Sequence, residues 1–393
     1  MKSFTIPALF ATAVIASGCT LSPLEEDVAY ERRDLWRQPA ITNIGAPAVD
    51  DSALYVIDLT GAVSRLSRKD GSVVWRQPSN PAGTPRGLVR GGNTILMSAS
   101  ELIAFAIADG SILWRQSNAA GVGELESAAL GNLVVPSIYR GSGDALALDE
   151  LTGREVWRGT MLPSTFTRSS DTVVRIFEPQ ISDGSIFATF MFWSLSHPEI
   201  PNRGGIGVSS ITEGGTRWSR LLPVVNARAS TLPSRVAVSQ DVVAASTFEG
   251  YIYVYDRQTG DSLWTGRPLP YKSLSGTEAS PDIRPVLALG GLVIAGSGIG
   301  TVSAFDARTG VSRWVTPSGN GATYEFDAVG TDRVLVLHGN GGVTLIDGVS
   351  GKILWRLRPT SERERLGHIV VSGDTVFGTS AVGGVSAFRL VQK

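Results

Sequence analysis

A glycine stands four residues before a tryptophan at seven places in this chain, and this repeat constrains the fold more than any other feature. The pairs are Gly71/Trp75, Gly110/Trp114, Gly153/Trp157, Gly214/Trp218, Gly260/Trp264, Gly310/Trp314 and Gly351/Trp355. Successive tryptophans are roughly 40 to 60 residues apart, which is the length of a four-stranded propeller blade or slightly more. An eighth tryptophan, Trp36, has no glycine at the corresponding position.

Each repeat divides into four short strands joined by tight turns. In the first repeat the pattern predicts strands over 44–49, 53–58, 62–67 and 72–77. The recurring glycine ends the third turn, where a short hairpin needs a positive φ. Four repeats also place an aspartate eight residues before the tryptophan, where its carboxylate can accept hydrogen bonds from turn amides: Asp149, Asp256, Asp306 and Asp347. We expect these residues to be structural, with each tryptophan lodged between neighbouring blades.

The two ends of the repeat array complement each other. Eight third strands are predicted, and the last, around Val385, reaches the C-terminus without a fourth strand or a tryptophan. The segment 35–38 (Leu-Trp-Arg-Gln) matches the outer strand at 74–77 (Val-Trp-Arg-Gln) closely. The sequence therefore predicts an all-β, eight-bladed propeller of four-stranded antiparallel blades over 35–393, in which the N-terminal strand completes the C-terminal blade.

Composition and motifs exclude several classes of function. The chain has 35 basic and 36 acidic residues, and no basic block suggests a nucleic-acid partner. Its three histidines lack metal-ligand spacing, and no nucleophile elbow, Walker loop or strand-linked dinucleotide fingerprint is present. We therefore predict no catalytic residue, no metal and no enzyme activity.

The N-terminus reads as a targeting segment. Lys2, an apolar run over 6–15 and three small residues at 16–18 predict a signal peptide over 1–18. The only cysteine, Cys19, follows directly and resembles the lipidated cysteine of a bacterial lipobox, and the Thr20 after it favours the outer membrane. The alternative is an ordinary signal peptide with an incidental cysteine. We read 19–34 as a lipidated N-terminus and flexible tether that holds the propeller at the periplasmic face of the outer membrane.

The long irregular segments fall on one face of the predicted ring. They follow Trp157 and Trp264, and a long hairpin spans 187–207. This hairpin contains Trp193, the one tryptophan outside the repeat. Two interpretations remain open: Phe190, Phe192 and Trp193 pack within a twisted hairpin, or they form an exposed aromatic patch that binds a partner over blades 4 and 5.

The segments 147–157 and 304–314 resemble the repeat of the pyrroloquinoline-quinone-type propellers. The chain lacks the adjacent cysteine pair found in many quinoprotein dehydrogenases, so we expect no quinone cofactor. With its lipobox, acidic tether and eight blades, it most resembles the BamB family of the outer-membrane β-barrel assembly machinery. That resemblance implies a non-catalytic scaffold, a monomeric subunit of a complex, which docks on a BamA-like barrel protein through loops of blades 4 and 5.

The resemblance also suggests a docking loop. The segment 162–168 is similar to the family's loop but has Thr165 and Thr167 where the family has leucines. We therefore predict that Phe166, Arg168, Phe192 and Trp193 bind the partner. The alternatives are a generic periplasmic propeller that binds another protein or a small ligand, and a quinoprotein dehydrogenase that uses the central funnel.

Overall fold

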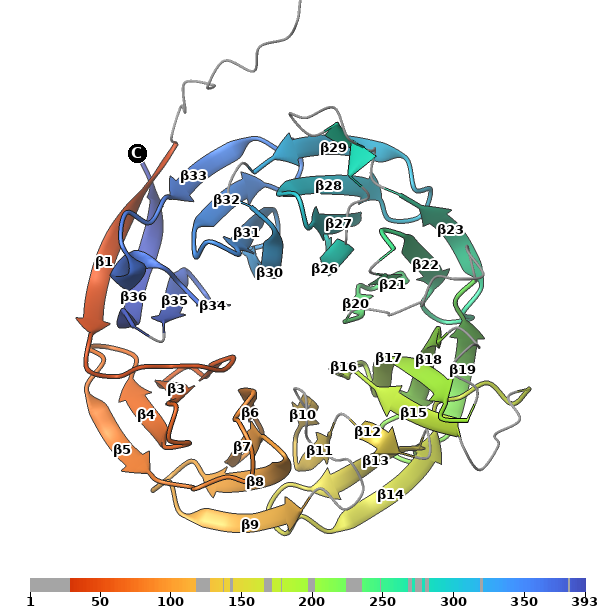
Figure 1. The fold of residues 1–393 in the computed structure, drawn as a ribbon, viewed down its shortest axis with the longest axis horizontal. Coiled ribbons are helices and arrows are strands. Elements are labelled where there is room, and N and C mark those ends of the chain that lie inside the picture. Colours follow the sequence, from red (N-terminus) through yellow and green to blue (C-terminus); the bar gives the residue numbers. More distant parts are fainter. Residues whose placement is uncertain are drawn as a thin grey trace, which may run out of the picture.

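The chain forms a closed ring of antiparallel sheets (Figure 1). The computed structural model describes residues 29–117, 128–136, 138–141, 144–165, 172–177, 179–196, 202–223, 235–247, 249–267, 271–272, 278–279, 283–318, 321–380 and 382–393. Seven of the eight blades are four-stranded sheets, and blade 4 is a six-stranded sheet. The predicted eight-bladed propeller is thus confirmed.

The strands of blades 1 to 4 follow one another along the chain, except for β12. Blade 1 contains β2 (Ala48–Val49), β3 (Ala53–Ile57), β4 (Val63–Ser67) and β5 (Val73–Gln77). Blade 2 contains β6 (Gly87–Arg90), β7 (Thr94–Ser98), β8 (Glu101–Ala106) and β9 (Ile112–Ser117). Blade 3 contains β10 (Ala128–Leu130), β11 (Leu133–Val135), β13 (Asp144–Asp149) and β14 (Glu155–Thr160). Blade 4 contains β12 (Ile138–Gly141), β15 (Thr172–Ile176), β16 (Gln180–Ser182), β17 (Ser185–Ser194), β18 (Arg203–Ser210) and β19 (Thr216–Leu221).

Blades 5 to 8 repeat the four-stranded plan. Blade 5 contains β20 (Ala237–Val238), β21 (Val242–Ser246), β22 (Ile252–Asp256) and β23 (Ser262–Gly266), and a separate pair follows, β24 (Tyr271–Lys272) with β25 (Glu278–Ala279). Blade 6 contains β26 (Ile283–Leu289), β27 (Leu292–Ser297), β28 (Thr301–Asp306) and β29 (Ser312–Pro317). Blade 7 contains β30 (Thr323–Val329), β31 (Arg333–His338), β32 (Val343–Asp347) and β33 (Ile353–Leu357). The short 3-10 helix η2 (Glu362–Glu364) precedes blade 8, which contains β34 (His368–Ser372), β35 (Thr375–Ser380), β36 (Gly384–Gln392) and β1 (Tyr30–Gln38).

Blade 8 closes the ring as predicted, with β1 paired antiparallel to β36. The strand β1 begins at Tyr30, earlier than the boundary expected at Leu35, so the last part of the predicted tether belongs to the sheet. The reason is packing: the Arg32 guanidinium lies 4.3 Å from the centre of the Phe388 ring, and Tyr30 packs against the apolar core between blades 7 and 8. At the far end, the Lys393 amide donates to the Ala29 carbonyl at 3.0 Å.

Seven of the repeat tryptophans contact the hairpin glycine of the next blade. A Cβ added to Gly71 would lie 2.5 Å from the Trp36 indole, so only glycine fits there. The same indole donates from Nε1 to the Arg68 carbonyl at 2.9 Å, three residues before that glycine. The arrangement recurs at all seven hairpin glycines, as the pairs Trp36/Gly71, Trp75/Gly110, Trp114/Gly153, Trp157/Gly214, Trp218/Gly260, Trp264/Gly310 and Trp314/Gly351. The glycine and tryptophan pairs of the sequence are therefore joints between blades.

Trp355 has no hairpin glycine to contact in the next blade. Like the other hairpin glycines, Gly351 contacts the tryptophan of the preceding blade, here Trp314, and blade 8 offers no hairpin glycine because its third strand, β36, runs on to Gln392. Trp355 still lodges between neighbouring blades, as expected, since it is 6% exposed in the core cluster shared by blades 7 and 8. Its ring centre lies 6.0 Å from that of Phe388 of blade 8. Trp218 and Trp264 make the same kind of aromatic contact with the next blade, so this seam keeps the aromatic contact and lacks only the glycine joint.

Every outer strand carries a β-bulge at the residue just before its tryptophan. In blade 1, Trp75 pairs with Arg65 and Val73 pairs with Leu66, which leaves Val74 unpaired. The bulge turns this residue outwards, and Val74 is 54% exposed. A bulge twists the edge of a sheet away from further pairing, so it protects the free outer edges of the ring. The bulged residues are Leu35, Val74, Leu113, Val156, Arg217, Leu263, Arg313 and Leu354.

The aspartates before the hairpin glycines cap the turns, as predicted. Asp306 accepts from the Thr309 amide at 3.0 Å and from the Thr309 hydroxyl at 2.9 Å. Arg313 also donates to this carboxylate at 2.7 Å, and these hydrogen bonds hold the pKa of Asp306 well below its usual range. Asp149, Asp256 and Asp347 accept in the same way from their own turns.

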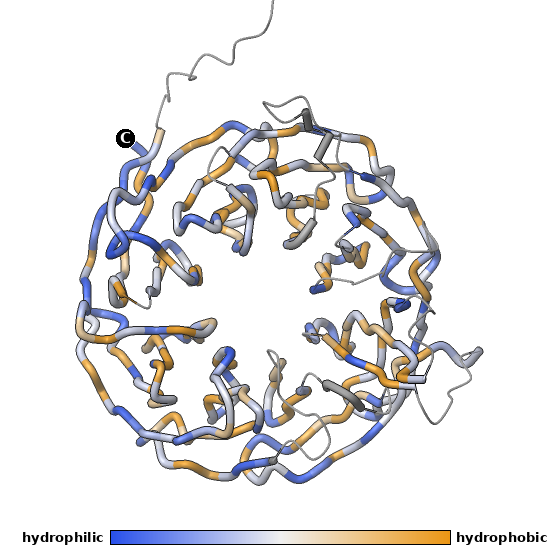
Figure 2. The backbone as a smooth tube through the Cα atoms, viewed as in Figure 1, coloured by the Kyte–Doolittle hydropathy of each residue, from blue (hydrophilic) through white to orange (hydrophobic). Residues whose placement is uncertain are grey.

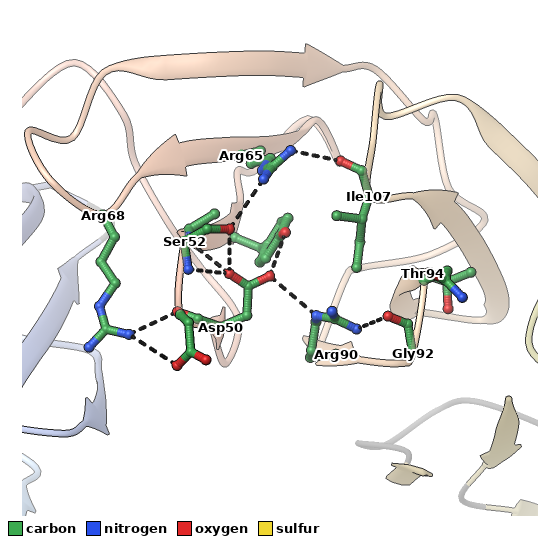
Figure 3. A network of polar contacts seen from close by, with 12 residues as sticks. Asp50, Ser52, Arg65, Arg68, Arg90, Gly92, Thr94 and Ile107 are labelled. Carbon is green, nitrogen blue, oxygen red and sulfur yellow. Dashed lines mark hydrogen bonds and ion pairs between the residues drawn. The ribbon is translucent and has the colours of Figure 1, made fainter. Parts of the chain in front are cut away.

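Polar side chains join the blades on the face that carries these hairpins. Arg68 in blade 1 donates to the Asp50 carbonyl at 3.0 Å and to the Ser372 carbonyl of blade 8 at 2.6 Å. Figure 3 shows the neighbouring carboxylate of Asp50, which accepts from Ser52 and from Arg90 of blade 2. Burial alone would raise the pKa of Asp50, but hydrogen bonds from Ser52, Tyr55 and the Ala53 amide lower it to about 2.

The apolar core follows the seams between blades. Buried clusters join neighbouring sheets, such as the one that contains Trp314 of blade 6 and Val336 of blade 7. Figure 2 shows apolar segments in every blade around the ring, without concentration on one side. The stability of this ring therefore depends on the contacts of each blade with its two neighbours.

Candidate functional site

Blade 4 has an elaboration that the other blades lack in the described ranges. The first part of β17 pairs with β16 as an ordinary second strand, while its second part, from Phe190 to Ser194, pairs with β15. The strand β12, which comes from between the second and third strands of blade 3, adds to β15. We call the face that carries the connections between blades and between second and third strands the loop face. The opposite face is the hairpin face.

Aromatic residues of β17 lie on both sides of this elaboration. Phe190 is fully buried in the core shared by blades 2 to 4, so it belongs to no exposed patch. Phe192 is half-buried and packs against the same core. Trp193 is half-buried on the other side, paired with Val173, and Leu195 beyond it is 67% exposed. Packing thus accounts for Phe190, whereas Trp193 and Leu195 present apolar surface near the loop face.

Three of the predicted site residues, Cys19, Phe166 and Arg168, lie outside the described residues. The segment that leads to Phe166 and Arg168 is described as far as Thr165, and Ser164 and Thr165 are exposed. Phe192 and Trp193 lie on the same blade that this segment reaches. Sequence reasoning did not find the strand β15, although its run Thr-Val-Val-Arg-Ile is rich in β-branched residues, which favour strands.

Both ends of the described chain lie on the hairpin face. The third strand of each blade runs towards this face, and β36 ends there beside the first residues of β1. The second part of β17 extends at the opposite, loop face, because it continues past the inner strand β16. An N-terminal attachment would therefore leave the loop face of blade 4 accessible.

Acidic side chains link the innermost strands of blades 7 and 8. Glu325 of the innermost strand β30 accepts from the Ile369 amide at 3.1 Å and contacts His368 Nδ1 at 2.5 Å. Two residues on, Asp327 accepts from the Val371 amide at 2.6 Å. Ile369 and Val371 are alternate residues of the strand β34, so their amides point to the same side. The carboxylates of Glu325 and Asp327 accept from these amides where the carbonyls of a further strand would otherwise do so.

The two most perturbed groups of blade 7 have opposite pH dependences. Burial raises the pKa of Asp327 to about 6, against the lowering effect of the hydrogen bonds from the Val371 and Ala328 amides. The contribution of Asp327 to folding stability is complete below pH 3.8, the ordinary pKa of its carboxyl group. It is lost as the pH rises through 6, where the buried carboxyl ionises. Burial lowers the pKa of His338 to about 4, so its contribution is complete above 6.5 and is lost as the pH falls through 4.

We expect Asp327→Asn to stabilise the protein at pH 7.5 by up to about 2–3 kcal/mol, because it removes a buried charge. The single amide oxygen can accept from only one of the Val371 and Ala328 amides, which reduces the gain. The gain should shrink as the pH falls through 6 and vanish near pH 4. Urea unfolding of the variant and the wild type at pH 7.5, 6 and 4.5 measures the difference, in which the effect of His338 cancels. A gain that is equal at all three pH values would contradict the assignment.

The described residues offer little for metal chemistry. Across the described ranges, no three histidine, cysteine or acidic side chains are grouped so that they could hold a metal ion.

In the same part of the chain, no helix combines the length and apolar character needed to cross a membrane.

Comparison with known proteins relates the ring to one family. The family model described as outer membrane protein assembly factor BamB matches residues 25–265, 195–316 and 298–390. The chain is 24% identical over 277 residues to the outer membrane protein assembly factor BamB of Burkholderia pseudomallei, covering 68% of this chain and 64% of that protein. It is 26% identical over 227 residues to the protein of that name from Nitrosomonas eutropha, covering 57% of this chain and 51% of that protein.

Solved structures share the fold at lower identity. BamB from Moraxella catarrhalis superposes with a TM-score of 0.64 at 17% identity, covering 92% of this chain and 98% of that one. The quinohemoprotein alcohol dehydrogenase of Comamonas testosteroni gives a TM-score of 0.65 at 14% identity, covering 93% of this chain and 76% of that one. These likenesses concern the fold alone. The match of the family model over most of the ring shows that the chain belongs to the BamB family of outer membrane protein assembly factors.

Proposed function

We propose that the protein is a non-catalytic scaffold, lipid-anchored through Cys19 at the periplasmic face of the outer membrane, that assists the assembly of β-barrel proteins. Membership of the BamB family supports this role. We further propose that it binds a BamA-like partner through the loop face of blades 4 and 5, where Trp193 and Phe192 lie, and that Phe166 and Arg168 also contribute to binding.

The observation that carries the site assignment is the long strand β17. It projects Trp193 and Leu195 past the ordinary edge of the blade, while β15 and β12 support it from one side. Tryptophan and arginine dominate the binding energy of protein interfaces, and a rigid strand holds such residues at little entropic cost. The position of the chain ends on the hairpin face supports the same arrangement, because an anchor there leaves this surface free.

We expect Trp193→Ala to weaken capture of the partner at least tenfold, because an interface tryptophan typically contributes more than about 2 kcal/mol. The measurement is crosslinking in cells, followed by identification and quantification of the bound proteins. Val315→Ala on the outer edge of blade 6 is the control, since that side chain is apolar and 42% exposed but lies far from blade 4. Capture of a barrel-assembly protein at wild-type yield by the Trp193 variant would overturn the site.

A further inference from the structure

Blade 8 carries a pocket at the place where its third strand continues instead of turning back in a hairpin. Beyond Phe388, the strand β36 pairs with the first part of β1, over 30–34. Side chains of this pairing and of blade 7 line a pocket of about 450 Å³. This volume is in the range of sites that hold small ligands. Figure 1 shows the C-terminus beside the start of β1, on the outside of the ring.

Two arginines of this pocket lie directly opposite each other. Arg33 of β1 and Arg389 of β36 are partners in the antiparallel register, and both line the pocket. Residues that are directly opposite have Cβ atoms about 5 Å apart on one face of the sheet, and like charges there destabilise the pairing. A third guanidinium, that of Arg333 in blade 7, lines the same pocket. An anion bound between these groups would remove their mutual repulsion.

The carboxylates near these arginines do not occupy the guanidinium groups fully. Each pair joins one nitrogen to one oxygen at 3.1–3.2 Å, whereas a guanidinium has several N–H donors. The carboxylate side chains are 50–69% exposed, and ion pairs with such exposed groups are weak. The pairs are Arg33/Glu31, Arg333/Asp332 and Arg389/Asp374.

The remaining walls of the pocket are suited to a ligand with both an anionic and an apolar part. The Arg333 guanidinium donates to the Tyr30 hydroxyl at 3.2 Å, which leaves the phenol hydrogen available to an acceptor. Leu35 is 42% exposed, and Leu390 and Val391 are half-buried beside it in the lining. Arginine binds phosphate oxygens particularly well, because its planar group donates two parallel hydrogen bonds.

We propose that this pocket, formed around Arg33, Arg333 and Arg389, binds the phosphate group of a membrane lipid headgroup. Tyr30 is the eleventh residue after Cys19, so the chain between them spans at most about 40 Å. An acylated Cys19 would hold the pocket within that distance of the bilayer. The choice of a lipid over a soluble phosphate ester therefore rests on the proposed function. Binding there would turn the hairpin face of blade 8 to the membrane and leave the loop face of blade 4 accessible.

The test is cosedimentation of residues 19–393 carrying Cys19→Ser with vesicles of phosphatidylcholine, with and without phosphatidylglycerol. This chain keeps every described residue and cannot be acylated, so binding reports the protein surface. Arg33→Gln combined with Arg389→Gln should weaken binding to the phosphatidylglycerol vesicles at least about tenfold, because each basic residue near an anionic membrane contributes roughly fivefold. If this double variant does not fold, Arg33→Gln alone replaces it, with an expected loss of at least about threefold.

The control is Arg158→Gln combined with Arg308→Gln, on blades 3 and 6. It removes the same charge from two arginines that are also exposed and paired with a carboxylate, and it should change binding less than twofold. Equal losses in the two double variants would overturn the pocket, because the binding would then depend on overall charge alone.

Calorimetric titration of the same chains with glycerol phosphate separates the two sources of a phosphate group. Vesicle binding that requires Arg33 and Arg389 supports the lipid headgroup. If the chain binds no vesicles but binds glycerol phosphate through these two arginines, the lipid assignment is wrong. If the unsubstituted chain binds neither, the pocket is overturned. Mass spectrometry of the wild type for acylated Cys19, and partner capture with Trp193→Ala, test the proposed function separately.

Discussion

Deletion of residues 30–38 should lower the midpoint of thermal unfolding by at least about 10 °C, the largest effect that we expect from any short change. The deletion removes β1 and leaves the outer edge of β36 unpaired. It also removes the Trp36 indole from Gly71 and its hydrogen bond to the Arg68 carbonyl, which join blade 8 to blade 1. Differential scanning calorimetry of the deleted and intact chains, both lacking 1–28, measures the change.

A point substitution separates closure from the loss of a strand. Trp36→Ala alone should cost about 3 kcal/mol, since it removes a large apolar contact and one hydrogen bond across the seam. Trp193→Ala serves as the matched control, because Trp193 is similarly half-buried but lies outside the inter-blade joints. Equal destabilisation by the two substitutions would show that closure by β1 contributes nothing beyond ordinary packing.

Substitution of a hairpin glycine should have the second largest effect, and blade 4 contains a matched pair for the experiment. Gly214 and Gly184 both have a φ of +67°. A Cβ on Gly214 would lie 2.3 Å from the Trp157 ring, whereas a Cβ on Gly184 meets no atom within 4 Å. Gly184→Ala should therefore cost only about 1–2 kcal/mol for the left-handed backbone. Gly214→Ala should cost about 3–5 kcal/mol, because the indole must also move.

Chemical unfolding of the two glycine variants measures this difference directly. Displacement of Trp157 also weakens its hydrogen bond from Nε1 to the Ile211 carbonyl, so indole fluorescence should shift in the Gly214 variant alone. A Gly184 variant as unstable as the Gly214 variant would mean that backbone strain, and not the contact with the neighbouring blade, explains these glycines.

The repeat predicted the number of blades and the closing strand because both depend on local signals. A glycine at a turn with positive φ and an aspartate that caps the same turn are needed within a few residues of each other, so their spacing is visible in the sequence. The similarity between 35–38 and 74–77 then predicted that the N-terminal strand is the outer strand of the C-terminal blade. The start of β1 at Tyr30 was not visible, since it depends on Arg32 meeting Phe388 at the other end of the chain.

The candidate site was only partly predictable for the same reason. Trp193 stood out because it breaks the repeat, but the burial of Phe190 and the pairing of Val173 with Trp193 are set by strands far apart in sequence. The hydrogen bonds from the edge of β34 to Glu325 and Asp327 likewise leave no local pattern in the sequence. The β-bulge before each tryptophan also appeared only in the structure, and it accounts for the exposure of Leu35, Val74, Leu113 and Val156.

The sequence by itself determined the architecture: eight blades and the closure of the ring by the N-terminal strand. Turn chemistry is local, and a repeat displays it many times. Only the tertiary structure decided what each repeat residue touches. In the structure, seven tryptophans contact the hairpin glycine of the next blade, and Trp355 contacts Phe388. The connection from blade 3 to blade 4 packs at Met161 against Gly207 and Ser219. Contacts between blades join residues that are tens to hundreds of positions apart, and no spacing rule within one repeat records them.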